Sequence, residues 1–252
     1  ESANVYAFFE DKDGKMWVGS EFNPIIILEY SNGTYKYSRS INSLAGADVR
    51  TITGILEDKN GNIWISSFGG GVFKFSKEEQ LHFSDSTGLT TNDVFTLFED
   101  KAGNIWIGTY QGGLIKYGGS KFEIYNNENG LGDNSVWSIT QDLRDNLYFG
   151  TNENGVVCYD GKKFTPITIE QGLTSNLIYG LEIDEKQRLW VGTDKGLNKI
   201  SFGENFQIVG IKSYDEDDGL RGTEVSQHGL FYDKNKVLWI STGNGLTRYN
   251  AF

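Results

Sequence analysis

Hydrophobic and polar residues alternate along this chain in short runs, and polar turns separate the runs. Between residues 94 and 125 the alternation predicts four strands, at Val94 to Glu99, Asn104 to Thr109, Gly113 to Tyr117 and Lys121 to Tyr125. The turn after the first strand reads Asp-Lys-Ala-Gly, in which the Asp accepts backbone hydrogen bonds and the Gly adopts a positive φ. A series of short strands joined by tight turns predicts an antiparallel sheet.

The same pattern recurs six times. Each copy starts with the turn Asp and has an aromatic residue six positions later, at Trp17, Trp64, Trp106, Tyr148, Trp190 and Trp239. The spacings between these residues are 47, 42, 42, 42 and 49. A period near 42 with a turn and an aromatic strand in each copy is typical of a propeller blade. We therefore predict an all-β fold, a β-propeller of six units of roughly 42 residues with four-stranded antiparallel blades.

The repeat also predicts the domain organisation. One blade cannot bury both of its faces, so we expect a single domain over 1–252 with units at about 1–46, 47–88, 89–130, 131–172, 173–219 and 220–252. The first and fifth of these repeat units hold extra residues, around Ser40 to Ala47 and within Phe202 to Asp218. The last unit ends after its third strand, so its blade should lack the outer strand. We expect the sequence, which starts at Glu1, to be part of a longer chain.

Alignment of the units on the turn Asp shows two informative columns. The residue three positions before the Asp is apolar and is predicted to be core: Phe8, Ile55, Leu97, Ile139, Leu181 and Leu230. The residue five positions before it stands at the entry to the inner strand: Tyr6, Thr53, Phe95, Trp137, Tyr179 and His228. Aromatic rings there could stack on sugar rings, or they could instead fill the wedges between blades.

The candidate ligand-binding residues combine this column with loop residues expected on the same face. They are Tyr6, Arg50, Phe68, Phe95, Tyr110, Trp137, Tyr179, Arg221 and His228. Polar groups beside aromatic rings suit a neutral or cationic polyhydroxyl ligand better than a polyanion. Arg50 and Arg221 could still pair with one carboxylate or sulfate.

Charge narrows the range of partners. The chain has 23 Lys and Arg against 34 Asp and Glu, a net charge of −11, which argues against nucleic acid and against an anionic lipid surface. No run of 18 apolar residues occurs, so direct membrane insertion is not predicted. The single cysteine, Cys158, lies in an apolar strand and is expected to be a small buried residue.

The sequence gives little support for catalysis. Its two histidines, His82 and His228, have neither metal-site spacing nor a nucleophile motif beside them, so we predict no enzyme activity, no cofactor and no metal. A lyase of the streptogramin-lyase type remains a minority interpretation. It would need a second His beside His228, and His82 is expected on an outer strand.

The repeat motif resembles a known family. Gly88-Leu-Thr-Thr-Asn92, an inner strand, Asp100-Lys-Ala-Gly-Asn-Ile-Trp-Ile-Gly-Thr109 and then Gly-Gly-Leu114 resemble the two-component regulator propeller repeat, and the resemblance extends over essentially the whole chain. It implies a periplasmic or extracellular sensor region of a hybrid two-component histidine kinase. The implied partners are a small-molecule or oligosaccharide ligand and other domains of a parent receptor, with a homodimer as a further option. A protein-interaction or dimerisation scaffold without a small ligand is the alternative function.

Overall fold

The computed structural model describes residues 4–21, 24–44, 47–48, 50–204 and 207–250. Antiparallel sheets make up nearly all of its regular structure, and two short 3-10 turns accompany them, η1 (Asp85–Thr87) and η2 (Ile169–Gln171). The predicted all-β propeller class is confirmed. Residues 1–124 and 125–252 form two compact units, called unit 1 and unit 2 below, and each is described by itself. The single-domain organisation stays a prediction.

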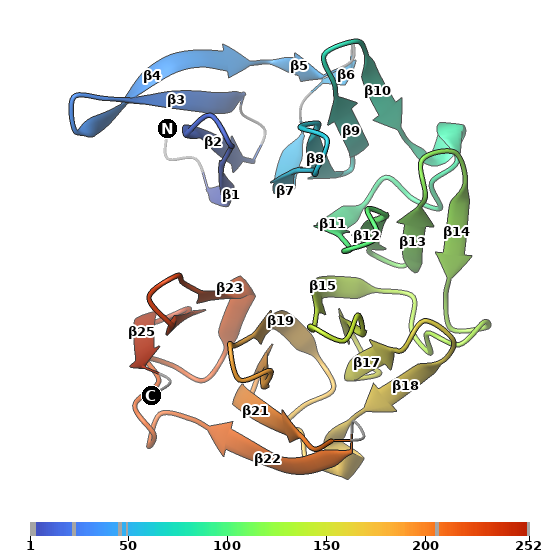
Figure 1. The fold of residues 1–252 in the computed structure, drawn as a ribbon, viewed down its shortest axis with the longest axis vertical. Helices are drawn as coiled ribbons and strands as arrows, with labels where there is room; N and C mark the ends of the chain where they lie inside the picture. The colour runs from blue at the N-terminus through green and yellow to red at the C-terminus, as the bar shows by residue number, and fades with distance from the viewer. Residues whose placement is uncertain (1–3, 22–23, 45–46, 49, 205–206, 251–252) are drawn as a thin grey trace. The chain divides into compact units, whose positions relative to one another are not determined.

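Unit 1 contains three four-stranded sheets, each a meander whose strands follow chain order (Figure 1). Blade 1 comprises β1 (Val5–Glu10), β2 (Lys15–Ser20), β3 (Ile25–Ser31) and β4 (Thr34–Ile41). Blade 2 comprises β7 (Thr51–Glu57), β8 (Ile63–Phe68), β9 (Gly71–Phe75) and β10 (Gln80–Phe83). Blade 3 comprises β11 (Val94–Glu99), β12 (Ile105–Thr109), β13 (Leu114–Tyr117) and β14 (Phe122–Tyr125), whose last residue reaches the unit boundary.

The predicted insertion in the first unit corresponds to a small two-stranded hairpin. Its strands are β5 (Ser43–Leu44) and β6 (Ala47–Asp48), which pair antiparallel. Residues 45–46 of the predicted insertion lie outside the described residues.

Unit 2 contains two four-stranded sheets and one three-stranded sheet. Blade 4 comprises β15 (Val136–Gln141), β16 (Leu147–Thr151), β17 (Val156–Tyr159) and β18 (Phe164–Ile167). Blade 5 comprises β19 (Ile178–Ile183), β20 (Leu189–Thr193), β21 (Gly196–Phe202) and β22 (Ile208–Tyr214). Blade 6 comprises β23 (Val225–Tyr232), β24 (Val237–Thr242) and β25 (Gly245–Asn250). The predicted lack of an outer strand in this blade is confirmed for the described part of the chain.

One hydrogen-bond pattern explains the fixed spacing between the turn Asp and the aromatic residue. In blade 3, Asp100 Oδ1 accepts the backbone N–H of Asn104 at 2.8 Å, and Oδ2 accepts the indole N–H of Trp106 at 2.8 Å. The same carboxylate-to-aromatic bond occurs in every blade, at 2.8, 2.9, 2.8, 3.1, 2.9 and 3.0 Å in chain order, with the Tyr148 hydroxyl as the donor in blade 4. The Asp therefore closes the turn and also satisfies the polar atom of a large ring inside the blade.

Apolar contacts between neighbouring blades form the core of each unit. The Leu of each Gly-Leu loop is buried, and Leu89 packs with Trp64 and Val94 in the core between blades 2 and 3: the four are Leu89, Leu131, Leu173 and Leu220. Glycines on the second strands allow close approach, since a Cβ built at Gly192 would lie 2.5 Å from Val225 Cγ1 of the next blade. Blade-to-blade contact therefore constrains both the Leu and the Gly of the repeat.

The prediction that the column three positions before the turn Asp is core is wrong for Phe8, which is 69% exposed. In blade 6 the equivalent residue packs on the preceding blade, since Leu230 Cγ lies 3.2 Å from a Cβ built on Gly180. Blade 1 has no preceding blade within unit 1, so the Phe8 ring has nothing to cover it there. Ile139, Leu181 and Leu230 are buried, as predicted.

Candidate functional site

The aromatic column lies at a β-bulge of the inner strands. In blades 1 to 5 the register between the first and second strands skips one residue, and the skipped residues are Tyr6, Thr53, Phe95, Trp137 and Tyr179. In blade 6 the irregularity runs from Val225 to Leu230 and contains His228, whose φ is 53°. A bulge leaves its extra residue outside the ladder and turns the side chain in a new direction. The repeat therefore presents one variable side chain per blade at the same end of the inner strand.

In unit 1 three rings pack together at this end of blades 2 and 3. Phe68 stacks on Phe95 with their centroids 5.6 Å apart, and Tyr110 meets Phe95 edge-on at 5.7 Å and Phe68 at 6.4 Å. Phe95 is only 8% exposed, whereas Phe68 is 39% exposed and Tyr110 is 37% exposed. We call these three residues the unit 1 ring cluster. A buried ring thus supports two rings that solvent can reach, a geometry that suits stacking against a flat apolar surface.

Charged and polar groups flank the unit 1 ring cluster. The Arg50 side chain lies along the turn between β8 and β9, since a Cβ built at Gly69 would be 3.3 Å from Arg50 Cδ. Asp93 approaches the same turn, and its carbonyl accepts the backbone N–H of Tyr110 at 2.8 Å. The exposed rings therefore stand beside one guanidinium and one carboxylate, which can donate to and accept from hydroxyl groups.

Thr53, the non-aromatic member of the column, has a structural role. Its side chain is buried, and its hydroxyl lies 2.8 Å from the Val94 carbonyl of the next blade and 2.9 Å from Ser66 Oγ. This hydroxyl joins the inner strands of blades 2 and 3, which accounts for the gap in the ring of aromatic residues.

In unit 2 the same position has a different chemistry. Trp137 and Tyr179 pack edge to face with their centroids 5.8 Å apart, and His228 Nε2 lies 2.9 Å from the Trp137 carbonyl. As only the protonated ring nitrogen can donate to a carbonyl, this bond places a proton on Nε2. The His228 side chain is open to water on one side, but the protein packed around it lowers its pKa, and the Trp137 bond opposes that shift. We call Trp137, Tyr179 and His228 the unit 2 cluster.

Acidic groups lie near the unit 2 cluster. Burial raises the pKa of Tyr179, and the nearby carboxylates Glu224 and Asp194 raise it further. Asp194 Oδ1 is buried and has no hydrogen-bond partner among the described residues. A buried acceptor near the Tyr179 ring suits a ligand group that donates hydrogen bonds. The sequence analysis named Asp194 and Glu224 only as loop residues, and the acidic character of this end of unit 2 appears only when they converge on Tyr179.

The structure gathers six of the nine candidate residues into these two clusters, and Arg50 flanks one of them. Tyr6 is exposed on β1 and takes no part in the ring contacts of either cluster. Arg221 lies against Gly245 in blade 6, and its backbone N–H donates to Thr247 Oγ1 at 3.0 Å. The nine residues therefore fall into local groups, and their common role as a binding surface stays a prediction.

Other candidate chemistry gains no support from the described residues. Among them no group of three His, Cys, Asp or Glu side chains could hold a metal ion, and no helix is long and apolar enough to cross a membrane. His82 stacks on Phe73 at 4.4 Å, and its Nε2 lies 2.8 Å from the Gly70 carbonyl. The expectation that Cys158 is buried is wrong in part, because the residue is half-buried and lines a surface pocket.

Comparison with known proteins identifies the repeat. Residues 1–22, 46–69, 88–111 and 172–195 match the sequence model of the two component regulator propeller family. The resemblance inferred from the motif is therefore confirmed. No curated protein sequence matches the chain.

Solved structures share the fold. The extracellular domain assigned to the hybrid two component system BT3049 from B. thetaiotaomicron matches with a TM-score of 0.85 and 22% identity, over 98% of this chain and 34% of that one. A similar domain assigned to BT4673 from the same organism matches with a TM-score of 0.75 and 23% identity, over 98% and 35%. Virginiamycin B lyase from Staphylococcus aureus matches with a TM-score of 0.68 and 13% identity, over 97% and 83%.

The chain thus spans about a third of the length of the two-component system domains that it matches. At these identities the likeness establishes the β-propeller fold alone. Extracellular domains of two-component systems and a lyase both have that fold, so the fold alone does not assign a function to this chain.

Proposed function

We propose that this chain, which carries two component regulator propeller repeats, is a ligand-sensing module of an extracytoplasmic receptor and performs no chemistry itself. The family match and the fold shared with extracellular domains of two-component systems support this proposal. The site chemistry supports it as well, because the clusters at the bulges combine rings, amide carbonyls and carboxylates without a paired acid, base and nucleophile.

The ligand class follows from the unit 1 ring cluster. Two adjacent rings are each more than a third exposed, and a third, buried ring holds them in place. A contiguous exposed apolar patch with polar residues at its rim often marks a ligand-binding or interaction site. Sugar rings have apolar faces that stack on aromatic rings and hydroxyl groups that pair with Arg and Asp. The unit 1 ring cluster with Arg50 and Asp93 is therefore proposed as an oligosaccharide site, and this exposed cluster is the observation that carries the proposal.

Binding would be passed to other domains of a parent receptor. Phe95 belongs to the inner strand β11, Phe68 is the last residue of the second strand β8, and Tyr110 directly follows the second strand β12. A ligand that bridges these rings links blades 2 and 3, so it would favour whichever state of the receptor holds the two blades in this arrangement. The other domains of the receptor would change between two conformational states when the ligand binds. The receptor could be a homodimer.

A thermal-shift screen against neutral and sulfated oligosaccharides tests this function. A ligand at 100 times its dissociation constant adds about 2.7 kcal/mol to the stability of the folded state. We expect such a shift in the native chain and its loss in Tyr110→Ala. The control variant is Tyr37→Ala, which removes a more exposed Tyr from the outer strand β4 of the same unit and should keep the full shift.

Two results would count against an oligosaccharide site. One is a thermal shift that persists in Tyr110→Ala, which would mean that the ligand binds elsewhere on the chain. The other is no shift with any sugar while both variants remain folded. The second result would favour the scaffold function, for which the three-stranded sheet of blade 6 offers a strand edge at β25.

A further inference from the structure

A pocket of about 400 Å³ lies in unit 1 at the outer part of blades 1 and 2, and we call it the unit 1 outer pocket. Its volume falls within the range of ligand pockets. The insertion between these two blades borders it through Ser43 of β5. Insertions and loops carried on a rigid scaffold often hold binding residues, so the chemistry of this pocket is informative.

The floor of the unit 1 outer pocket is apolar. Ile41 of blade 1 and Ile63 and Phe75 of blade 2 line it, and all three pack on the core that the two blades share. Trp17 also lines it, is only 6% exposed and donates its indole N–H to Asp11. The floor therefore presents carbon surface to a ligand, against which the face of a small ring can pack.

Two cationic side chains line the same pocket. Arg39 comes from the outer strand β4 of blade 1, and Lys77 comes from the loop after β9 of blade 2. Within the described part of the chain neither side chain forms an ion pair, and no Asp or Glu lines the pocket. The whole chain has 34 Asp and Glu against 23 Lys and Arg, so a pocket with two cations and no acid stands apart from the rest of the surface. Its charge favours an anion.

The neighbouring carboxylates belong to other surroundings. Glu29 of β3 accepts the Ser38 hydroxyl at 3.0 Å and lines a different pocket. Burial raises the pKa of Tyr117 in blade 3, and Glu79, in the loop after β9, raises it further, so Glu79 acts on the side of blade 2 away from blade 1. Glu78 of the same loop is exposed and does not line the pocket. These acids therefore leave both cations available to a ligand.

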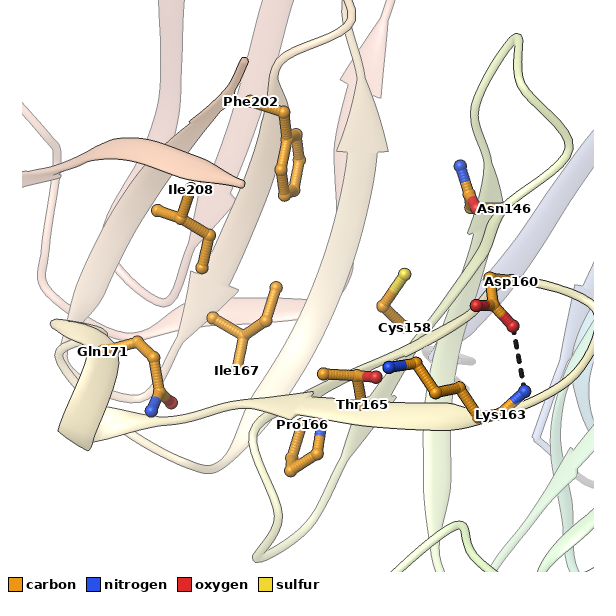
Figure 2. A pocket seen from close by; sticks show the side chains of 10 residues that line it. All are labelled: Asn146, Cys158, Asp160, Lys163, Thr165, Pro166, Ile167, Gln171, Phe202 and Ile208. Atoms are coloured by element: carbon orange, nitrogen blue, oxygen red, sulfur yellow. Dashed lines mark hydrogen bonds between the residues drawn. The ribbon is translucent and has the colours of Figure 1, made fainter. Parts of the chain in front are cut away.

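The repeat provides the same two positions at other pairs of neighbouring blades. Arg39 lies on the outer strand in line with the aromatic anchor, and Lys77 lies two residues after the partner of the residue before the next anchor. Figure 2 shows the equivalent groove of blades 4 and 5, where Thr165 and Phe202 hold these positions. The remaining pairs are Leu81 and Gly119 in blades 2 and 3, and Glu123 and Gly161 in blades 3 and 4.

The last pair of blades is described only in part. Lys212 holds the outer-strand position of blade 5, and its counterpart in blade 6 lies outside the described residues. Among the four pairs that the structure describes in full, two cations occur together only in blades 1 and 2. The blade scaffold does not require these charges, since the other three pairs pack without them.

We propose that the unit 1 outer pocket binds a small carboxylate carried on a six-membered ring, with the carboxylate between Arg39 and Lys77 and the ring on the apolar floor. A guanidinium group can pair with both oxygens of a carboxylate, and Lys77 adds a second positive charge. The amide of Gln80, which also lines the pocket, can donate to or accept from a hydroxyl group on the ring. The pocket is separate from the unit 1 ring cluster and does not depend on the function proposed for it, so failure of one leaves the other standing.

Isothermal titration calorimetry with benzoate and with D-glucuronate tests the proposal. The two acids share the carboxylate but carry an aromatic ring and a sugar ring, so they separate two sources of the same chemistry. Benzyl alcohol and D-glucose are their neutral counterparts. We expect at least one acid to bind the native chain about tenfold or more tightly than its counterpart, the ratio that one charge-assisted hydrogen bond provides.

Substitution of either cation should remove this preference. Arg39→Gln and Lys77→Gln each keep a long polar side chain at an exposed position, so the fold should persist while the affinity for the acid falls about tenfold. Arg39→Lys keeps the charge without the planar fork and should lose less than Arg39→Gln. The matched control is Lys36→Gln, which removes an exposed cation of the same strand that does not line the pocket and should leave the affinity unchanged.

Four outcomes would overturn the proposal. Two concern the native chain: no heat of binding with either acid at millimolar concentration, and acids that bind no more tightly than their neutral counterparts. A third is undiminished binding of the acid in both folded Gln variants of the pocket. The fourth is an equal loss of affinity in Lys36→Gln, which would indicate a general attraction of anions to this strand. Circular dichroism of each variant establishes that it is folded.

Discussion

The inner strands of the two units share one repeat but differ in chemistry. In unit 1 the bulge residues and their neighbours form an apolar ring cluster, Phe68, Phe95 and Tyr110. In unit 2 the equivalent positions combine two rings with His228, whose Nε2 lies 2.9 Å from the Trp137 carbonyl, and two carboxylates, Glu224 and Asp194, lie near Tyr179. The unit 1 ring cluster offers an apolar surface, whereas the unit 2 cluster offers groups whose charge depends on pH.

The two units also differ at a position further along the inner strand. Two positions before the turn Asp, unit 1 has Phe9, Leu56 and Phe98, whereas blade 5 of unit 2 has Glu182. Burial raises the pKa of Glu182 to about 8, and the backbone N–H of Tyr232 opposes that shift. A carboxyl group has therefore taken a position that unit 1 fills with apolar side chains, and much of it is protonated at neutral pH.

The comparison separates scaffold from surface within one repeat. Both units use the turn Asp, the aromatic anchor and the loop Leu in the same structural roles. Every blade must close its turn by hydrogen bonds and pack against its neighbour. The bulge residue leaves the ladder, so it can vary without breaking the sheet. We expect substitutions in unit 1 to act through packing and those in unit 2 to act through protonation.

The largest effect is expected from Phe95→Ala. This change removes the buried ring under Phe68 and Tyr110 and should lower the free energy of unfolding by about 3 kcal/mol. Tyr179→Ala, at the same repeat position in unit 2, removes a half-buried ring and should cost less than half as much. Urea denaturation followed by far-ultraviolet circular dichroism measures both values. Equal losses would mean that the two clusters are packed alike and that the contrast drawn here is wrong.

The sequence predicted the scaffold well because the scaffold repeats. The period of the Trp anchors, the turn Asp and the short last blade were all visible, and the strands of blade 3 begin within one residue of their predicted positions. Each of these features is local, and six copies average out the variation of any one of them. The burial of Phe8 was predicted wrongly because it depends on a neighbouring blade and not on the strand itself.

The sites were harder to predict, because they arise where the repeat varies. The aromatic column was visible as a column, but its position at a bulge depends on backbone register. The acids near Tyr179 come from separate loops that no spacing rule connects.

A second effect, which reaches a similar size only at the upper end of the pH range, is expected from Glu182→Gln. The pKa of Glu182 rises from an ordinary value of 4.5 to about 8 on folding, so the folded state holds a proton that the unfolded state has lost. Stability from this group is complete below pH 4.5 and falls as the pH rises towards 8. The Gln variant has no such loss, so between pH 5 and pH 8 its stability should fall less than that of the native chain, by on the order of 3 kcal/mol.

Urea denaturation at several pH values measures this difference. The control is Glu128→Gln, which changes an exposed carboxylate in a loop of the same unit and should leave the pH dependence unchanged. Parallel pH profiles for the native chain and Glu182→Gln would show that Glu182 is ionised in the folded protein, and unit 2 would then lose its main titrating group.

The smallest effect is expected from His228→Asn, because His228 is open to water on one side. Its pKa is lowered in the folded state, so as the pH falls below about 6.5 the unfolded chain takes up this proton first, and stability declines. Asn tolerates the left-handed backbone of this residue, whose φ is 53°, and it does not titrate. The variant should therefore lose part of the decline below pH 6.5, while His82→Asn, which leaves His228 in place, should keep it. If the free energy of unfolding of His228→Asn falls with pH as it does in the native chain, the pKa of His228 is the same in the folded and unfolded states. The acid sensitivity of the chain would then arise outside the unit 2 cluster.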